Sequence, residues 1–109
     1  KLRAKNRDTC TTLGPWFVDA ADVPDPMALA RRTTVNGQVT QQGNTRDMIF
    51  DAPFLIEYFS RFMTLSPGDL ILTGTPDGVV DCKPGDVVVT EIERIGALMN
   101  TIETIQGKA

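Results

Sequence analysis

The chain is organised around one stretch of ten residues, Asp69-Leu70-Ile71-Leu72-Thr73-Gly74-Thr75-Pro76-Asp77-Gly78. Its first part, Leu70 to Thr73, is a short apolar run that follows a turn, which is typical of a strand buried on both faces. The run stops at Gly74, which has no Cβ, and at Pro76, which has no N–H to donate. Two interpretations of the loop 73–76 follow. It is either a tight turn that needs Gly74 for its backbone angles, or a strand-end loop that presents an N–H group and a hydroxyl to an anion.

Composition and charge restrict the classes of function. The 109 residues carry a net charge of −3, and the eleven Lys and Arg are scattered, so no nucleic-acid partner is expected. No apolar run approaches the roughly 20 residues of a membrane helix, and the first residues are too polar for a signal peptide. Two distant cysteines, Cys10 and Cys82, match no zinc spacing, and reduced thiols in a cytoplasmic protein are expected. The chain has no histidine, which removes serine–histidine and cysteine–histidine catalysis.

Strand patterns dominate the chain. The dipeptide Asn36-Gly37 predicts a hairpin between strands 29–35 and 38–42, because both residues accept positive φ. Further strands are expected within 13–18 and at 70–73, 87–92 and 97–102. With about six strands and one helix, the predicted class is a β-dominated α+β fold.

The single predicted helix runs from about Ala52 to Met63. Asp51 is its expected N-cap, and Pro53 lies in the first turn, where a missing N–H costs little. Apolar and aromatic side chains recur at helical spacing, among them Phe54, Tyr58 and Phe62. This aromatic stripe is expected to pack against the sheet as core.

Two groups of charged residues are candidates for chemistry. Glu91 and Glu93 would share one face of a strand and suit Mg²⁺ or Mn²⁺, but the alternation of a half-exposed sheet favours a solvated face for them. Lys5 with Asp8 could stabilise an enolate or oxyanion, or could be solvated surface. Arg31-Arg32 is interpreted as a basic dipeptide on a strand, without a role.

Taken together, segments over nearly the whole chain resemble the fumarylacetoacetate hydrolase family in order and spacing. The segments are Lys5-Asn6-Arg7-Asp8-Thr9, Leu13-Gly14-Pro15-Trp16, Val35-Asn36-Gly37, Gln42, Gly43-Asn44-Thr45-Arg46-Asp47-Met48-Ile49-Phe50, Pro67-Gly68-Asp69, Thr73-Gly74-Thr75-Pro76-Asp77-Gly78-Val79, Pro84-Gly85-Asp86 and Glu91-Ile92-Glu93. The resemblance is to the branch of 4-hydroxyphenylacetate breakdown, which isomerises 2-hydroxyhepta-2,4-diene-1,7-dioate and decarboxylates 5-carboxymethyl-2-oxo-hex-3-ene-1,7-dioate.

The resemblance implies a β-roll in a cytoplasmic, homo-oligomeric enzyme that acts on a 2-oxo or enol dicarboxylate. A divalent metal, Mg²⁺ or Mn²⁺, would chelate the substrate and stabilise an enolate. By motif match, Lys5 would line the pocket as a catalytic residue and offset enolate charge. Gly74 and Thr75 would hold the substrate carboxylate.

The resemblance also implies what these residues lack. The family's metal ligands, a Glu-x-Glu pair and an Asp, precede the segment where this chain begins, so no metal ligand is expected within residues 1–109. The chain is therefore expected to be the C-terminal portion of one catalytic domain, inactive alone and partnered by the remainder of that domain or by a second chain. Arg94 stands where the family usually has a glycine.

Two rival functions stay open from the sequence. One is an acylpyruvate hydrolase or oxaloacetate decarboxylase of the same family, which shares the loops quoted above. The other is a non-catalytic half-domain used for assembly, which would dock on a second chain through the aromatic helix.

Overall fold

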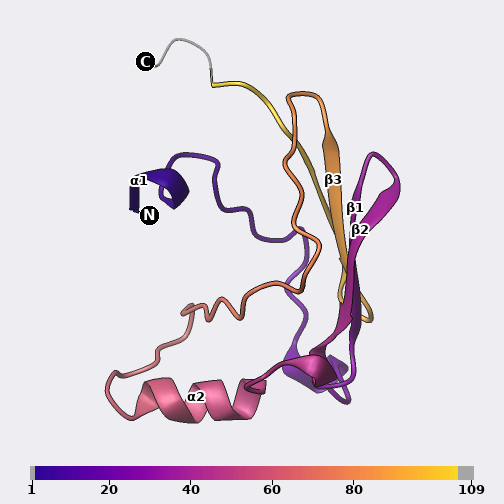
Figure 1. Ribbon diagram of the computed structural model, residues 1–109. Coiled ribbons are helices and arrows are strands. Elements are labelled where there is room, and N and C mark those ends of the chain that lie inside the picture. The colour runs from indigo at the N-terminus through magenta and orange to yellow at the C-terminus, as the bar shows by residue number, and fades with distance from the viewer. Residues whose placement is uncertain (1, 106–109) are drawn as a thin grey trace.

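Four antiparallel strands form the centre of the chain, which a computed structural model describes over residues 2–105 (Figure 1). In the order β2-β1-β3-β4, they are β1 (Ala30–Val35), β2 (Gln38–Asn44), β3 (Val87–Ile92) and β4 (Gly96–Thr101). The helices are α1 (Leu2–Lys5), α2 (Ala52–Ser60) and the 3-10 turns η1 (Ala20–Asp22) and η2 (Thr45–Asp47). The β-dominated α+β class is confirmed, with four strands among the described residues where six were predicted.

The turn Asn36-Gly37 joins β1 to β2 as predicted. Its two residues have φ of 52° and 82°, the left-handed geometry of a two-residue hairpin turn. Asn36 also ties the turn to β3, because its side-chain oxygen accepts the Val87 N–H over 2.9 Å. The backbone N–H of Lys83 and the Asn36 amide both donate to Asp86 and lower the pKa of that carboxyl.

A bulge at Thr40 decides which side chains of β2 share a face. Thr33 lies opposite Gln41 and Thr34 lies opposite Val39, so Thr40 between them has no opposite residue in the β1 register, although its hydroxyl donates to the Thr33 carbonyl over 3.3 Å. Residues two apart on a regular strand share a face, but here the bulge separates Val39 from Gln41. Gln41 is accordingly buried, whereas Val39 is 47% exposed on the other face.

The turn between β3 and β4 contains a strained residue. β3 has its predicted bounds, and β4 begins and ends one residue before the predicted strand 97–102. The Ile95 N–H donates to the Ile92 carbonyl over 3.1 Å, and Arg94 between them has a left-handed φ of 64°. A left-handed φ is unfavourable for a residue with a Cβ, which explains why glycine suits this position.

Helix α2 begins as predicted and ends three residues early. The Asp51 side chain caps it by accepting the Phe54 N–H over 2.8 Å. At the other end, the Arg61 and Phe62 N–H groups donate to carbonyls only three residues back, a tighter turn than the α-helix. None of the helices in residues 2–105 is long and apolar enough to cross a membrane.

The aromatic stripe of α2 does not pack against the sheet, so that prediction is wrong. Figure 1 shows α2 projecting away from one end of the sheet, where no strand lies across its face. Its rings contact one another instead: the Phe50 and Phe54 centroids are 4.8 Å apart, and those of Tyr58 and Phe62 5.6 Å. Phe54 and Phe62 are left 42% and 62% exposed.

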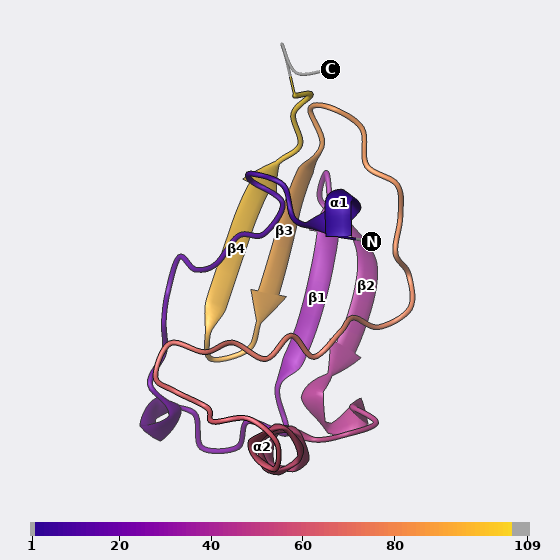
Figure 2. The ribbon, with the colours of Figure 1, turned by 90° about the vertical axis from the view of Figure 1, so that its left-hand side faces the viewer.

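Two predicted strands are absent from the described residues. The segment 70–73 pairs with no strand, and Leu72 is 80% exposed, because the chain after α2 crosses the strands rather than running beside one (Figure 2). The expected strand within 13–18 is also irregular, with Phe17 97% exposed. A strand needs a neighbour that accepts and donates its backbone hydrogen bonds, and neither segment has one here.

The irregular segments cover one face of the sheet and leave the other bare (Figures 1 and 2). On the covered face, the Asn100 side chain donates to the Thr12 hydroxyl over 3.1 Å. Among the described residues, the buried apolar side chains are only Val23 and Leu29. The covered face therefore has few fully buried apolar side chains.

Candidate functional site

The loop 73–76 makes the turn that its sequence predicts. Gly74 has a φ of +91°, so the need for glycine in the turn is confirmed. Within the described residues, a Cβ added to Gly74 would meet no atom within 4 Å, so the glycine serves backbone conformation rather than close packing. Thr75 follows on the exposed side of the turn, with its hydroxyl directed at the sheet.

Two side chains of the sheet hold the Thr75 hydroxyl. Gln41 of β2 donates to Thr75 Oγ1 from Nε2 over 2.9 Å, and Arg31 of β1 donates from Nη1 over 3.3 Å. The Gln41 amide also donates to the Pro76 carbonyl over 2.7 Å, and Arg31 Nη2 donates to the Thr33 hydroxyl over 2.8 Å. The loop is thus joined to both strands of the hairpin.

Close backbone contacts fix the same segment along β2. A Cβ on Gly43 would lie 3.6 Å from Pro76 Cγ, an ordinary van der Waals contact. A Cβ on Gly78 would instead collide with the carbonyl oxygen of Thr40, the bulge residue. Only glycine therefore lets residue 78 approach the strand so closely.

The loop and its surroundings offer hydrogen-bond donors and a positive charge. Within residues 2–105, the backbone N–H groups of Gly74 and Thr75 donate to no protein acceptor. The half-buried Arg31 belongs to neither ion pair of that range, which are Arg32–Glu91 and Arg61–Glu57. Free donors beside an uncompensated guanidinium suit a carboxylate ligand.

The structure does not bring Lys5 into contact with this loop. Lys5 ends α1 with an exposed side chain, and none of the hydrogen bonds within the described range joins it to Gly74 or Thr75. Figure 2 shows α1 on the covered side of the sheet, the side that the loop also occupies. The assignment of Lys5 to the pocket stays a prediction.

The two glutamates of the Glu91-Ile92-Glu93 motif have separate partners. Glu91 lies on the bare face and pairs with Arg32, with Nη2 and Oε2 3.0 Å apart. Glu93 lies in the turn after β3, where its Oε1 accepts the Ala30 N–H over 3.2 Å. Across residues 2–105, no three His, Cys, Asp or Glu side chains gather as a metal site. These residues therefore do not fit the divalent metal that the resemblance implies.

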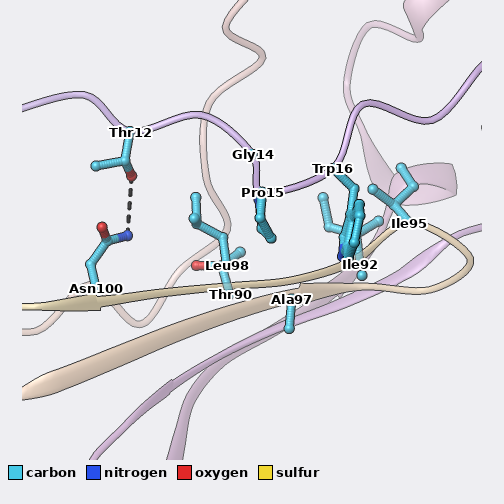
Figure 3. A pocket seen from close by; sticks show the side chains of 11 residues that line it. Thr12, Gly14, Pro15, Trp16, Thr90, Ile92, Ile95, Ala97, Leu98 and Asn100 are labelled. Carbon is cyan, nitrogen blue, oxygen red and sulfur yellow. Dashed lines mark hydrogen bonds between the residues drawn. The ribbon is translucent and has the colours of Figure 1, made fainter.

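A separate cavity of about 310 Å³ lies between the segment 12–16 and the strands β3 and β4. Figure 3 shows Trp16 and Leu98 lining it, with the Thr12–Asn100 hydrogen bond at one end. Neither the loop 73–76 nor its partners Arg31 and Gln41 line this cavity. It is therefore distinct from the candidate site.

Arg31 and Gln41 are the site residues that sequence reasoning missed. Strand alternation places Arg31 on the same face as Thr33, and this pattern could have indicated Arg31. No sequence pattern indicated Gln41, because in a strand without the bulge it would lie opposite Arg32, on the other face.

Comparison with known proteins agrees with this architecture. Residues 1–103 match the family model "Fumarylacetoacetate (FAA) hydrolase C-terminal". The 4-hydroxyphenylacetate degradation bifunctional isomerase/decarboxylase of Salmonella dublin is 56% identical over 93% of this chain, which spans only 24% of that relative.

Two solved structures are similar to this chain in both fold and sequence. One is a 2-hydroxyhepta-2,4-diene-1,7-dioate isomerase from Mycobacterium marinum, with 48% identity and a TM-score of 0.87. The match covers 97% of this chain and 40% of the isomerase chain. The other is the maleylpyruvate hydrolase from Sphingobium sp. SYK-6 in complex with manganese(II) and pyruvate, with 40% identity and a TM-score of 0.83. The match covers 85% of this chain and 35% of the hydrolase chain. The resemblance seen in the sequence is confirmed: the chain belongs to the fumarylacetoacetate hydrolase family.

Proposed function

We propose that the complete protein isomerises and decarboxylates unsaturated 2-oxo dicarboxylates of 4-hydroxyphenylacetate degradation, and that this chain supplies the carboxylate-binding wall of its site. The observation that carries the proposal is that, within residues 2–105, the Gly74 and Thr75 N–H groups have no protein acceptor and the neighbouring Arg31 belongs to no ion pair. The bifunctional relative, whose name states both reactions, supports the choice of substrate. In this role the loop binds and orients the substrate, and Lys5 offsets the negative charge of an enolate.

We also propose that the complete enzyme takes a divalent metal, Mg²⁺ or Mn²⁺. The manganese complex of the related maleylpyruvate hydrolase supports this. Its ligands would lie outside the described residues of this chain, so no catalytic step is assigned to the metal here. The same relative favours a second candidate function, acylpyruvate hydrolysis, because an acylpyruvate presents the same 2-oxo carboxylate to the loop.

Thr75→Val in the complete enzyme tests the proposal, because it removes the hydroxyl and nearly keeps the shape. We expect substrate binding to weaken by about 1–3 kcal/mol, while the melting temperature changes little. Thr64→Val, at an exposed position after α2, is the matched control. Unchanged affinity in Thr75→Val would leave the loop as only a turn. Turnover of the seven-carbon diene against acylpyruvates separates the two functions.

The exposed aromatic face of α2 supports the rival role in assembly. A chain that docks through α2, on the remainder of its domain or on a second copy, would cover Phe54, Tyr58 and Phe62. Native mass spectrometry of the 109-residue chain tests docking between copies. A species above 11.9 kDa that splits under denaturant supports it, and a lone 11.9 kDa species contradicts it.

A further inference from the structure

The Thr75 hydroxyl has no acceptor capacity left for a ligand. A hydroxyl has one proton to donate and two lone pairs that accept. Gln41 and Arg31 donate to Thr75 Oγ1 over 2.9 and 3.3 Å and engage both lone pairs. The remaining capability of this hydroxyl is to donate its own proton to a further group.

The polarity of this contact is set by Gln41. The Pro76 carbonyl can only accept, so the amide group that faces it over 2.7 Å must be the NH₂ group of Gln41. The other proton of the same nitrogen then goes to Thr75. Gln41 is 9% exposed, so water has little access to compete for these bonds.

We propose that Gln41 is a positioning residue that keeps Thr75 as a hydrogen-bond donor toward the anionic oxygen of the substrate. The inference rests on the proposed function of the loop and adds the reason why the hydroxyl has the right polarity for a carboxylate. Arg31 occupies the second lone pair and brings positive charge to the same point.

The test compares four variants of the complete enzyme: Gln41→Glu, Gln41→Leu, Thr75→Val and Gln42→Glu. A glutamate at 41 can only accept, so it would take the Thr75 proton away from the substrate. We expect KM to rise on the order of tenfold in Gln41→Glu, with a smaller change in kcat. Gln41→Leu, which frees the hydroxyl to rotate, should raise KM less. Gln42→Glu, the same change one residue along, should leave KM unchanged, because residue 42 lies on the bare face.

The pH dependence separates positioning from a structural role. As pH falls toward the pKa of the introduced carboxyl, its protonated form can donate again, so the KM penalty of Gln41→Glu should shrink while that of Gln41→Leu stays constant. The KM of the double variant Gln41→Glu/Thr75→Val should not exceed the higher of the two single-variant KM values, because both substitutions act through the Thr75 hydroxyl.

The outcomes distinguish the two proposals. Weaker binding in Thr75→Val with normal binding in both Gln41 variants would overturn the role of Gln41 and leave the loop's function standing. Additive penalties in the double variant would also overturn it. Normal binding in Thr75→Val would instead remove the proposed function of the loop. If Gln41→Glu does not fold, Gln41→Leu decides alone, since a KM equal to that of the unmodified enzyme contradicts the proposal.

Discussion

The amide nitrogen of Gln41 lies 2.9 Å from the Thr75 hydroxyl and joins the hairpin to a loop 34 residues later in the chain. Arg31 reaches the same hydroxyl from the neighbouring strand. The contact fixes the turn 73–76 and its donors against the sheet, and the polarity of these donors suits a carboxylate.

Arg31→Met should weaken substrate binding in the complete enzyme. The guanidinium is half-buried and outside both ion pairs of residues 2–105, so its charge is available to an anion. We expect KM to rise on the order of tenfold or more and to become less sensitive to salt. Arg32→Met is the matched control, because it breaks the exposed pair with Glu91 on the other face and should cost less than about 1 kcal/mol of stability. Equal KM values for the two variants would contradict the role of Arg31.

Lys5→Ala should lower kcat with little change in the melting temperature. The side chain is exposed at the end of α1, so its loss removes little packing. Stabilisation of a developing enolate by a positioned cation is worth on the order of a hundredfold in rate. Steady-state kinetics with thermal denaturation of the complete enzyme measure both effects. Full activity with a lost melting transition would make Lys5 structural.

Gly78→Ala should displace the loop from β2. The new Cβ would meet the Thr40 carbonyl, and the φ of +103° is unfavourable for alanine. We expect a loss of about 2 kcal/mol or more, together with weaker substrate binding. Gly85→Ala separates the two causes, because its φ of +93° is similar and no atom of residues 2–105 lies within 4 Å of the added Cβ. Equal stability losses in urea denaturation would show that the close contact is unimportant.

Arg94→Gly should stabilise the chain. Arg94 has a left-handed φ of 64° in the β3–β4 turn, and glycine adopts this conformation without the Cβ penalty. The expected gain is about 0.5–1 kcal/mol in the free energy of unfolding, because relief of the Cβ penalty exceeds the greater backbone entropy that glycine loses on folding. Arg94→Ala, which removes the charge and keeps the Cβ, should give no such gain. A gain of the same size in Arg94→Ala would assign the effect to charge.

Asp86 should make folding acid-sensitive. Hydrogen bonds from the Lys83 backbone N–H and the Asn36 side chain lower its pKa below the ordinary value of 3.8. A carboxyl whose pKa is lower in the folded than in the unfolded chain stabilises the fold at pH values above its ordinary pKa. This stabilisation is lost as the pH falls through the pKa of the folded state. Denaturant unfolding at about pH 7 and about pH 3 measures the difference. Asp86→Asn should lose less stability between these two conditions, and an identical loss would contradict the prediction.

Local chemistry made part of the fold predictable. The Asn36-Gly37 turn, the Asp51 cap and the bounds of β3 depend on residues close in sequence, and all three are as predicted. The buried strand at 70–73 and the packed aromatic stripe were wrong. An apolar pattern indicates which side chains favour burial and does not supply the surface that buries them.

The candidate site was predictable only in its loop. Gly74 and Thr75 follow from turn chemistry and from the family motif. Arg31 and Gln41 belong to the site because the loop approaches the sheet from a distant part of the chain. No local pattern encodes such an approach.

The bulge at Thr40 couples the register of the hairpin to the candidate site. A regular ladder from the same turn would pair Thr33 with Thr40 and would turn Gln41 to the bare face. The bonds of Gln41 to Thr75 and Pro76 exist only in the bulged register. Docking of the loop therefore favours the bulged register over the regular one, so the alignment of β1 with β2 and the assembly of the candidate site depend on each other.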